Sequence, residues 1–267
     1  MTGSDTSERA EHLSKVQLYF DEHAEFWSDL YDRPESGNDR VLANRTKLAV
    51  RMITERTPVG SLVLDAGCGG GVASLALAMH GYRVHGLDIA ADLLRHAELR
   101  LKSSSVPHDN WRVIHSDLLG AGYADHSFDA IVALGFIQYQ PDEIRTLREL
   151  GRILKPGGHL VITGPTEHRL SAWLDFEKHF KSLRRRLSAS KNAKNAKSSE
   201  LQRVLEISPH HYSPARFRQL LTDSGFEVRE YIGHGFGDYN RPLEKLARFL
   251  PIGRWANDLV FLTAKRP

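Results

Sequence analysis

The chain has 267 residues, of which 41% are hydrophobic and 26% are charged, and its formal net charge is +3. This composition is typical of a globular chain with a buried core, and the length suits a single α/β sheet with insertions. No apolar run is long enough to span a bilayer and no apolar signal core stands at the amino terminus, so we expect no transmembrane segment and a cytoplasmic location. The only cysteine, Cys68, excludes an internal disulfide and a cysteine-ligated metal cluster.

The amino-terminal part of the chain has mainly helical periodicity. We expect residues 1–10 to be disordered and residues 11–57 to form two helices with a break at residues 32–39. Trp27 and Tyr31 lie on one face of the first of these helices. An aromatic stripe with helical spacing usually packs in a core, so these residues are candidates for core packing as well as for ligand contact.

A glycine-rich turn follows the first expected strand. The apolar residues 62–64 end at Asp65, glycines follow at positions 67, 69 and 71, and the next residues have helical periodicity. Glycine is needed where the backbone takes a positive φ or approaches a ligand closely. The carboxyl end of a parallel strand is also where open α/β sheets bind ligands. The turn therefore predicts a ligand site.

The spacing and charge of this turn bear on the kind of ligand. The dinucleotide fingerprint G-x-G-x-x-G, counted from Gly67, would need a glycine at the position of Val72. No Lys or Arg lies between Leu62 and Met79, and the carboxylate of Asp65 opposes a pyrophosphate. A ligand with positive charge and no phosphate fits better. S-adenosylmethionine, which carries a sulfonium and an ammonium group, is such a ligand.

Two further strands are expected to end near acidic residues. Residues 83–88 form a strand that ends at Asp88, about twenty residues beyond the glycines, where a carboxylate can accept hydrogen bonds from both ribose hydroxyls. NAD enzymes use the same arrangement, and Asp88 could also cap the helix expected at residues 90–101. After the strand at residues 111–115, Asp117 can accept a hydrogen bond from an adenine amino group.

The next expected strand, residues 128–134, is apolar along almost its whole length, as in a parallel strand that is covered on both faces. Together these motifs resemble the class I S-adenosylmethionine-dependent methyltransferases, and residues 148–160 resemble their UbiE-like, small-molecule branch. The resemblance covers about residues 60–165 and 214–231. It implies a doubly wound α/β fold with a seven-stranded, mostly parallel sheet whose final hairpin makes one strand antiparallel.

We divide the chain into a helical cap at residues 1–57 and a methyltransferase domain at residues 58–267, with lid insertions at residues 166–213 and 233–256. In related enzymes such a cap folds over the cofactor, S-adenosylmethionine, and a Tyr or Arg meets its methionine end. Tyr31 and Arg45 are the candidates for that role. The other cofactor-binding residues that the resemblance implies are Asp65, Gly67, Cys68, Gly69, Asp88, Ile89, Ser116, Asp117, Leu118 and Leu134.

The resemblance implies methyl transfer to a small organic acceptor, with oxygen as the expected acceptor atom. Catalysis must hold the acceptor in line with the methyl group, and a neutral hydroxyl acceptor also needs a base, which favours histidine. His211 and His210 are the candidate bases, and Tyr139, His168 and Tyr212 are candidate substrate-binding residues. We expect no metal, because neither an acid nor a third histidine stands at ligand spacing from the adjacent histidines.

Residues 181–197 contain seven Lys and Arg residues and no acid, and without these charges the net charge of the chain would be −4. The segment is either a solvated loop or a lid that attracts an acidic substrate, a carrier protein or an anionic surface. RNA-directed methylation is an alternative, although the segment has no aromatic residues for base stacking.

Three further expectations concern partners and alternatives. We expect no DNA partner, because residues 135–138 lack the Asn/Asp-Pro-Pro-aromatic motif of amino-group methylation and no second cysteine is present for cytosine methylation. The late insertion at residues 233–256 could form a homodimer contact. The contrasting hypothesis is an NAD-dependent oxidoreductase, which the glycine spacing and Asp117 oppose.

Overall fold

A computed structural model describes residues 3–32, 37–167, 207, 210–234 and 258–265. The predicted lid insertions lie largely outside the described residues. The basic segment 181–197 and the candidate substrate-binding residue His168 lie wholly outside them.

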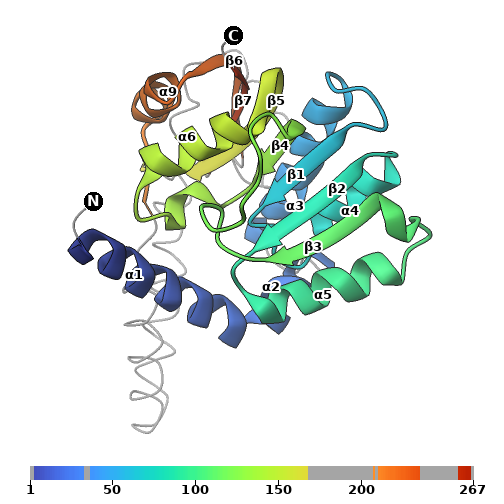
Figure 1. Cartoon of the computed structure of the whole chain (residues 1–267). Helices are drawn as coiled ribbons and strands as arrows, with labels where there is room; N and C mark the ends of the chain where they lie inside the picture. The colour runs from blue at the N-terminus through green and yellow to red at the C-terminus, as the bar shows by residue number, and fades with distance from the viewer. Residues whose placement is uncertain (1–2, 33–36, 168–206, 208–209, 235–257, 266–267) are drawn as a thin grey trace, which may run out of the picture.

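The centre of the molecule is one seven-stranded sheet with the strand order β3-β2-β1-β4-β5-β7-β6 (Figure 1). Strands β1 to β5 pair in parallel, and β7 runs antiparallel to both of its neighbours. This arrangement confirms the predicted fold class. The strands are β1 Leu62–Ala66, β2 Arg83–Asp88, β3 Trp111–His115, β4 Phe128–Ala133, β5 Leu154–Pro165, β6 Phe226–His234 and β7 Asp258–Lys265.

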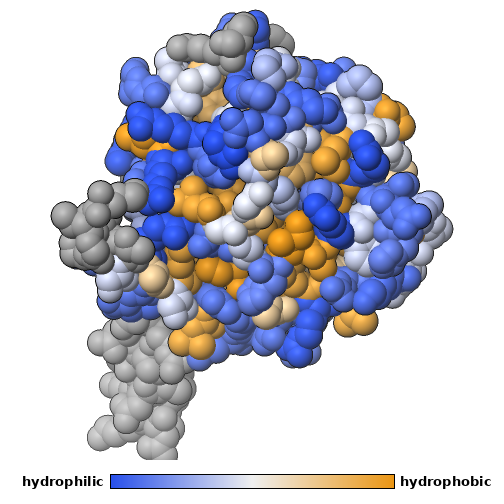
Figure 2. All heavy atoms as spheres, in the orientation of Figure 1, coloured by the Kyte–Doolittle hydropathy of each residue, from blue (hydrophilic) through white to orange (hydrophobic). Residues whose placement is uncertain are grey.

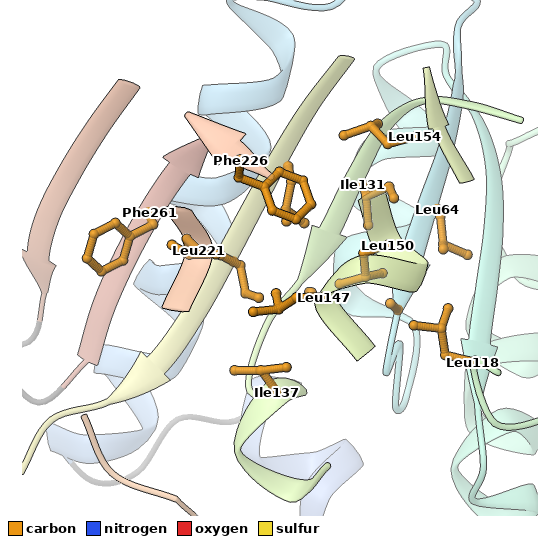
Figure 3. Close-up of a cluster of buried hydrophobic side chains, with 14 of the residues drawn as sticks. Leu64, Leu118, Ile131, Ile137, Leu147, Leu150, Leu154, Leu221, Phe226 and Phe261 are labelled. Carbon is orange, nitrogen blue, oxygen red and sulfur yellow. The ribbon is translucent and has the colours of Figure 1, made fainter. Parts of the chain in front are cut away.

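Helices cover both faces of the sheet because the strands bury side chains on both sides. In β1, Val63 packs into one hydrophobic cluster and the next residue, Leu64, into another. The first cluster includes residues of α3 (Gly37–Thr54), α4 (Val72–Met79) and α5 (Ala91–Lys102). The second includes residues of α6 (Glu143–Ile153) and α9 (Pro214–Asp223), whose leucines point toward the sheet in Figure 3.

The amino-terminal segment differs from the prediction. Helix α1 spans Gly3–Glu22, so the expected disorder is wrong for residues 3–10, and α2 (Ala24–Asp32) is a separate helix before α3. The described region therefore has three helices where two were predicted. The inner face of α1 is buried at Leu13 and Val16, which are 6% and 4% exposed. Tertiary packing of this kind stabilises helices whose own propensity is weak, and the sequence pattern does not reveal it.

Parallel pairing places the carboxyl ends of β1, β2 and β3 at one edge of the sheet. Asp65 pairs in register with Gly86, and Asp88 at the end of β2 pairs with His115 at the end of β3. The acids at or just beyond these strand ends therefore lie at the same edge, and α1 lies across it (Figure 1). No helix in the described ranges is long and apolar enough to cross a membrane.

Candidate functional site

The glycine turn after β1 needs glycine for two reasons. Gly67, Gly69 and Gly71 have φ angles of 72°, 51° and 75°, which are unfavourable for residues with a Cβ atom. Space is also lacking, because a Cβ on Gly71 would lie 2.8 Å from the Cβ of Ala97 in α5. Gly71 therefore lets α4 begin in close contact with α5.

Asp88 holds this turn in place. Its Oδ2 accepts a hydrogen bond from the amide of Gly69 at 2.8 Å, and its Oδ1 accepts one from the amide of Ala90 at 2.9 Å. The two bonds fix the carboxylate between the glycine turn and the start of α5. Burial raises the pKa of Asp88 despite these donors. Both interpretations of the sequence are compatible with this position, since Asp88 supports the helix start and also lines the pocket described below.

Asp65 is a buried carboxyl group at the end of β1. It is 2% exposed, and its Oδ2 accepts a hydrogen bond of 2.6 Å from the hydroxyl of Ser74. Burial, together with the nearby charge of Asp88, raises its pKa to about 6, and the Ser74 hydroxyl opposes that rise. Burial also raises the pKa of the Cys68 thiol, so Cys68 is a small protonated side chain and no nucleophile.

A single pocket contains the predicted cofactor residues. All of the predicted cofactor-binding residues line it, and so does the predicted substrate residue Tyr139. In the view of Figure 2, hydrophobic residues are exposed in the middle of the visible face and are surrounded by hydrophilic ones.

The pocket has an unusual balance of charge for a nucleotide site. Its lining includes three carboxyl groups, those of Asp65, Asp88 and Asp117, and Arg45 is the one Lys or Arg among the described lining residues. Arg45 is 5% exposed, and its Nη2 donates to the hydroxyl of Tyr31 at 3.4 Å. Such a lining repels a pyrophosphate and suits a ligand with positive charge and one carboxylate.

Helix α1 contributes pocket residues that the sequence analysis did not name. Leu13, Val16 and Phe20 line the pocket from one face of this helix. The helix is held at both sides of the pocket: the Nη2 of Arg9 lies 3.0 Å from the Oδ1 of Asp117, and the ring of Phe20 meets that of Tyr139 edge-on, with centroids 5.2 Å apart. The i, i+3, i+7 spacing of the three apolar residues is the signal that could have found this wall.

Two polar atoms in the pocket wall are buried without a hydrogen-bond partner in the described part of the chain. They are the indole nitrogen of Trp27 and the Oε1 of Gln138, whose side chain is only 9% exposed. A buried polar atom without a partner costs about 1–3 kcal/mol. Both atoms lie beneath the pocket surface, so a ligand reaches either one only when its side chain rotates.

The predicted bases and one predicted substrate residue lie elsewhere. His210 and His211 do not line the pocket, and the Nδ1 of His210 lies 2.7 Å from the Oε1 of Glu143. Tyr212 donates to the same oxygen, and its ring is fully buried against Phe217, with centroids 4.6 Å apart. Its ring is therefore part of the core, and contact between Tyr212 and the substrate stays a prediction.

No group of His, Cys, Asp and Glu side chains within the described ranges has the geometry of a metal site.

Known proteins share this sequence pattern. Residues 64–162 match the family described as "Methyltransferase domain". The chain is 30% identical over 180 residues to a ubiquinone biosynthesis O-methyltransferase of Xanthomonas axonopodis pv. citri, covering 66% of each chain. It is 33% identical over 148 residues to the enzyme of the same name from Xylella fastidiosa, covering 55% of this chain and 58% of that one. The match thus spans less than two thirds of the length of these curated relatives.

Solved structures share the fold. Magnesium protoporphyrin IX methyltransferase from Synechocystis with bound SAH has a TM-score of 0.64 and 16% identity, covering 94% of this chain and 98% of that one. An N1-methyltransferase from Burkholderia thailandensis, with bound 1,6-didemethyltoxoflavin and S-adenosylhomocysteine, has a TM-score of 0.60 and 14% identity, covering 97% and 91%. Similarity at these identities establishes the architecture alone.

Proposed function

Since the chain belongs to the class I S-adenosylmethionine-dependent methyltransferases, we propose that it transfers a methyl group from S-adenosylmethionine to an oxygen atom of a small organic acceptor. One observation carries this proposal. The acids at or just beyond the carboxyl ends of β1, β2 and β3 line one pocket beside a glycine turn, and Arg45 is the one described Lys or Arg in its wall. This arrangement favours a nucleoside that carries a cationic sulfur and opposes one that carries a diphosphate.

The pocket offers a partner for each part of the cofactor. Asp88 accepts from the ribose hydroxyls, and Asp117 accepts from the adenine amino group while Leu118 packs on the ring. Arg45 binds the methionine carboxylate with support from the hydroxyl of Tyr31. Asp65 favours the ammonium group, because a nearby cation offsets the cost of ionising this buried carboxyl group. When bound, the cofactor supplies a methyl group on a sulfonium, which is a good leaving group.

The remaining walls of the pocket suit an acceptor of low charge. Phe20, Leu42 and Tyr139 are apolar or aromatic. Methylation forms an oxygen–carbon bond as the sulfur–carbon bond breaks, and a neutral hydroxyl also loses its proton. The protein's main contribution is to hold the oxygen in line and to exclude water, and such orientation is worth several kcal/mol, about 7–11 at most.

The base for a neutral hydroxyl acceptor stays a prediction. His211 and His210 are the proposed bases, although neither lines the pocket and His210 is bonded to Glu143. If one of these histidines is the base, the methyl-transfer rate of the unsubstituted chain should rise with pH as that histidine loses its proton. Replacing it by Ala should abolish this rise. A rate that keeps its pH profile in both variants would remove this assignment.

The proposed function is tested by binding to the full chain. S-adenosylhomocysteine should bind in a calorimeter and raise the melting temperature, while NAD should do neither. Asp88→Asn should weaken S-adenosylhomocysteine binding about ten-fold or more, because charge-assisted hydrogen bonds are worth about 1.5–3 kcal/mol. Asp92→Asn, a nearby acid in the first turn of α5 that does not line the pocket, is the matched control. Tight binding of NAD with no binding of S-adenosylhomocysteine would overturn the proposal.

Partners and location remain at the level of prediction. An acidic partner for residues 181–197, a homodimer and a cytoplasmic location are proposals that follow from the sequence. The apolar and aromatic residues beside Tyr139 in the pocket wall support a small molecule as acceptor.

A further inference from the structure

The amino-terminal helix contributes a charged contact to the cofactor pocket. Arg9 of α1 lies 108 positions before Asp117, yet its Nη2 donates to the Oδ1 of Asp117 at 3.0 Å. Both side chains are about three quarters buried, with 22% and 26% exposure. Because its two residues are so far apart in the sequence, this ion pair does not stabilise α1 locally. It instead joins α1 to a residue of the pocket wall.

The contact leaves one oxygen of Asp117 available. The Oδ1 of Asp117 accepts from Arg9 and, at 2.8 Å, from the amide of Gly120. Within the described ranges no donor bonds to Oδ2. Two donors on one oxygen fix the rotation of the carboxylate. They also reduce the free-energy cost of keeping it charged beside the adenine amino group. The second oxygen then has a defined direction in which to accept.

We infer that Arg9 is a positioning residue for the adenine of the cofactor and that, through Asp117, it sets a preference for a 6-amino purine. The inference rests on the proposed function, because it takes S-adenosylmethionine as the ligand. A carboxylate oxygen accepts from the 6-amino group of adenine but faces a lone pair on the 6-oxo group of hypoxanthine. Arg9 makes this difference large by keeping the oxygen in place.

The attachment of α1 does not depend on Arg9 alone. The Nε2 of His12 lies 3.0 Å from the carbonyl oxygen of Tyr139, and the carboxylate of Asp21 accepts from the amide of Asp92 at 2.9 Å. Leu13 and Val16 are buried beneath the helix. Substitution of Arg9 is therefore expected to leave α1 docked while it frees the carboxylate of Asp117.

The test compares two ligands on the full chain. The dissociation constants of S-adenosylhomocysteine and S-inosylhomocysteine, which differ in the amino and oxo groups of the purine, are measured by calorimetry. The variants are Arg9→Ala, Arg9→Lys, Asp117→Asn and the double variant Arg9→Ala with Asp117→Asn. Lys15→Ala is the matched control, since Lys15 is an exposed cation of the same helix that pairs with Glu11.

The ratio of the two dissociation constants separates positioning from a merely structural role. We expect Arg9→Ala to reduce the preference for the amino ligand about ten-fold, Arg9→Lys to keep part of it, and Lys15→Ala to keep all of it. Arg9→Ala should have little further effect once Asp117 is Asn. If Arg9→Ala weakens both ligands equally, or neither, the inference is wrong. If the unsubstituted chain binds neither ligand, the proposed function itself fails.

Discussion

At the scale of single residues, Asp65 shows how the site conflicts with stability. Its carboxyl group is 2% exposed, and the hydrogen bonds from the hydroxyl and the backbone of Ser74 do not compensate for the loss of water. Burial therefore raises its pKa to about 6. A carboxyl group that is costly to ionise in the empty pocket gains most from a cationic ligand, which is the ligand that we propose.

The stability of the ligand-free protein should therefore carry a pH-dependent contribution from Asp65. Its pKa rises from 3.8 in the unfolded chain to about 6 in the folded one, so between these values the folded state retains a proton that the unfolded state has lost. The contribution is greatest below this window and is lost as the pH rises through it, and the whole shift corresponds to roughly 3 kcal/mol. The measurement is the free energy of unfolding in urea, between pH 4 and pH 8, for the unsubstituted chain and for Asp65→Asn.

The free energy of unfolding of the unsubstituted chain should fall relative to that of Asp65→Asn between about pH 4 and pH 6. The variant should also bind S-adenosylhomocysteine more weakly, so it gains stability at neutral pH and loses affinity. Ser74→Ala, which removes the only side-chain donor to this carboxyl group, should move the window to higher pH. If the curves for Asp65→Asn and the unsubstituted chain are parallel over the whole pH range, folding does not raise the pKa of Asp65.

The sequence predicted the site residues that follow strands and missed those on α1. Asp65, Asp88 and Asp117 were predictable because a strand, its parallel neighbours and their common edge follow from local apolar runs. Arg9 was not, because its partner Asp117 is 108 positions away and no local pattern records such a pair. The burial of Tyr212 was not predictable either, because a tyrosine beside two histidines looks polar in sequence, whereas the fold buries its ring.

At the scale of elements, the contact between α4 and α5 depends on Gly71. This residue precedes α4 with a φ of 75°, and its carbonyl accepts from the amide of Leu75 at 2.8 Å, within the first turn of the helix. The missing Cβ lets Ala97 of α5 approach. The position thus joins the backbone of the cofactor turn to the packing of two helices.

Gly71→Ala should lower the free energy of unfolding by about 2–5 kcal/mol. The left-handed conformation costs a residue with a Cβ about 1–2 kcal/mol, and overpacking against Ala97 adds about 1–3 kcal/mol. Gly122→Ala is the matched control, since Gly122 has a φ of 66° but no atom within 4 Å of the added Cβ, and it should cost only about 1 kcal/mol. Both are measured by urea denaturation.

A second substitution separates the two causes. Ala97→Gly in the Gly71→Ala background removes the clashing methyl group, so it should recover part of the loss and leave the strain of the backbone. If the double variant is no more stable than expected from adding the two single effects, the close contact with Ala97 does not limit this position.

Whole elements were predictable where local signals were strong. The largely apolar strands β1 and β4 agree with the sequence analysis, because parallel strands buried on both faces are apolar along most of their length. Helix α1 was taken for disorder over its first turns, because its stability comes from packing over a pocket that other elements form.

At the scale of the whole molecule, the sheet has two regions with different tasks. The edge formed by β1, β2 and β3 carries the acids of the pocket, while β5, β7 and β6 form the other half of the sheet. Phe261 of β7 lies in this second half, fully buried, with its ring against those of Phe217 and Tyr231. It faces the cluster that includes the leucines of α6 and α9 (Figure 3).

Phe261→Ala should therefore reduce stability and leave cofactor affinity intact. Removing a buried phenylalanine ring costs about 3–5 kcal/mol, a large part of the ~5–15 kcal/mol that stabilises a domain. Phe26→Ala removes the same ring from a site that is 59% exposed and should change the free energy of unfolding by less than about 0.5 kcal/mol. Well below the melting temperature, both variants should bind S-adenosylhomocysteine as the unsubstituted chain does.

Because a ligand at a hundred times its dissociation constant adds about 2.7 kcal/mol, saturation should raise the stability of Phe261→Ala and of the unsubstituted chain by the same amount. A smaller gain in Phe261→Ala would mean that packing in the β5–β7–β6 half helps to shape the pocket at the other edge.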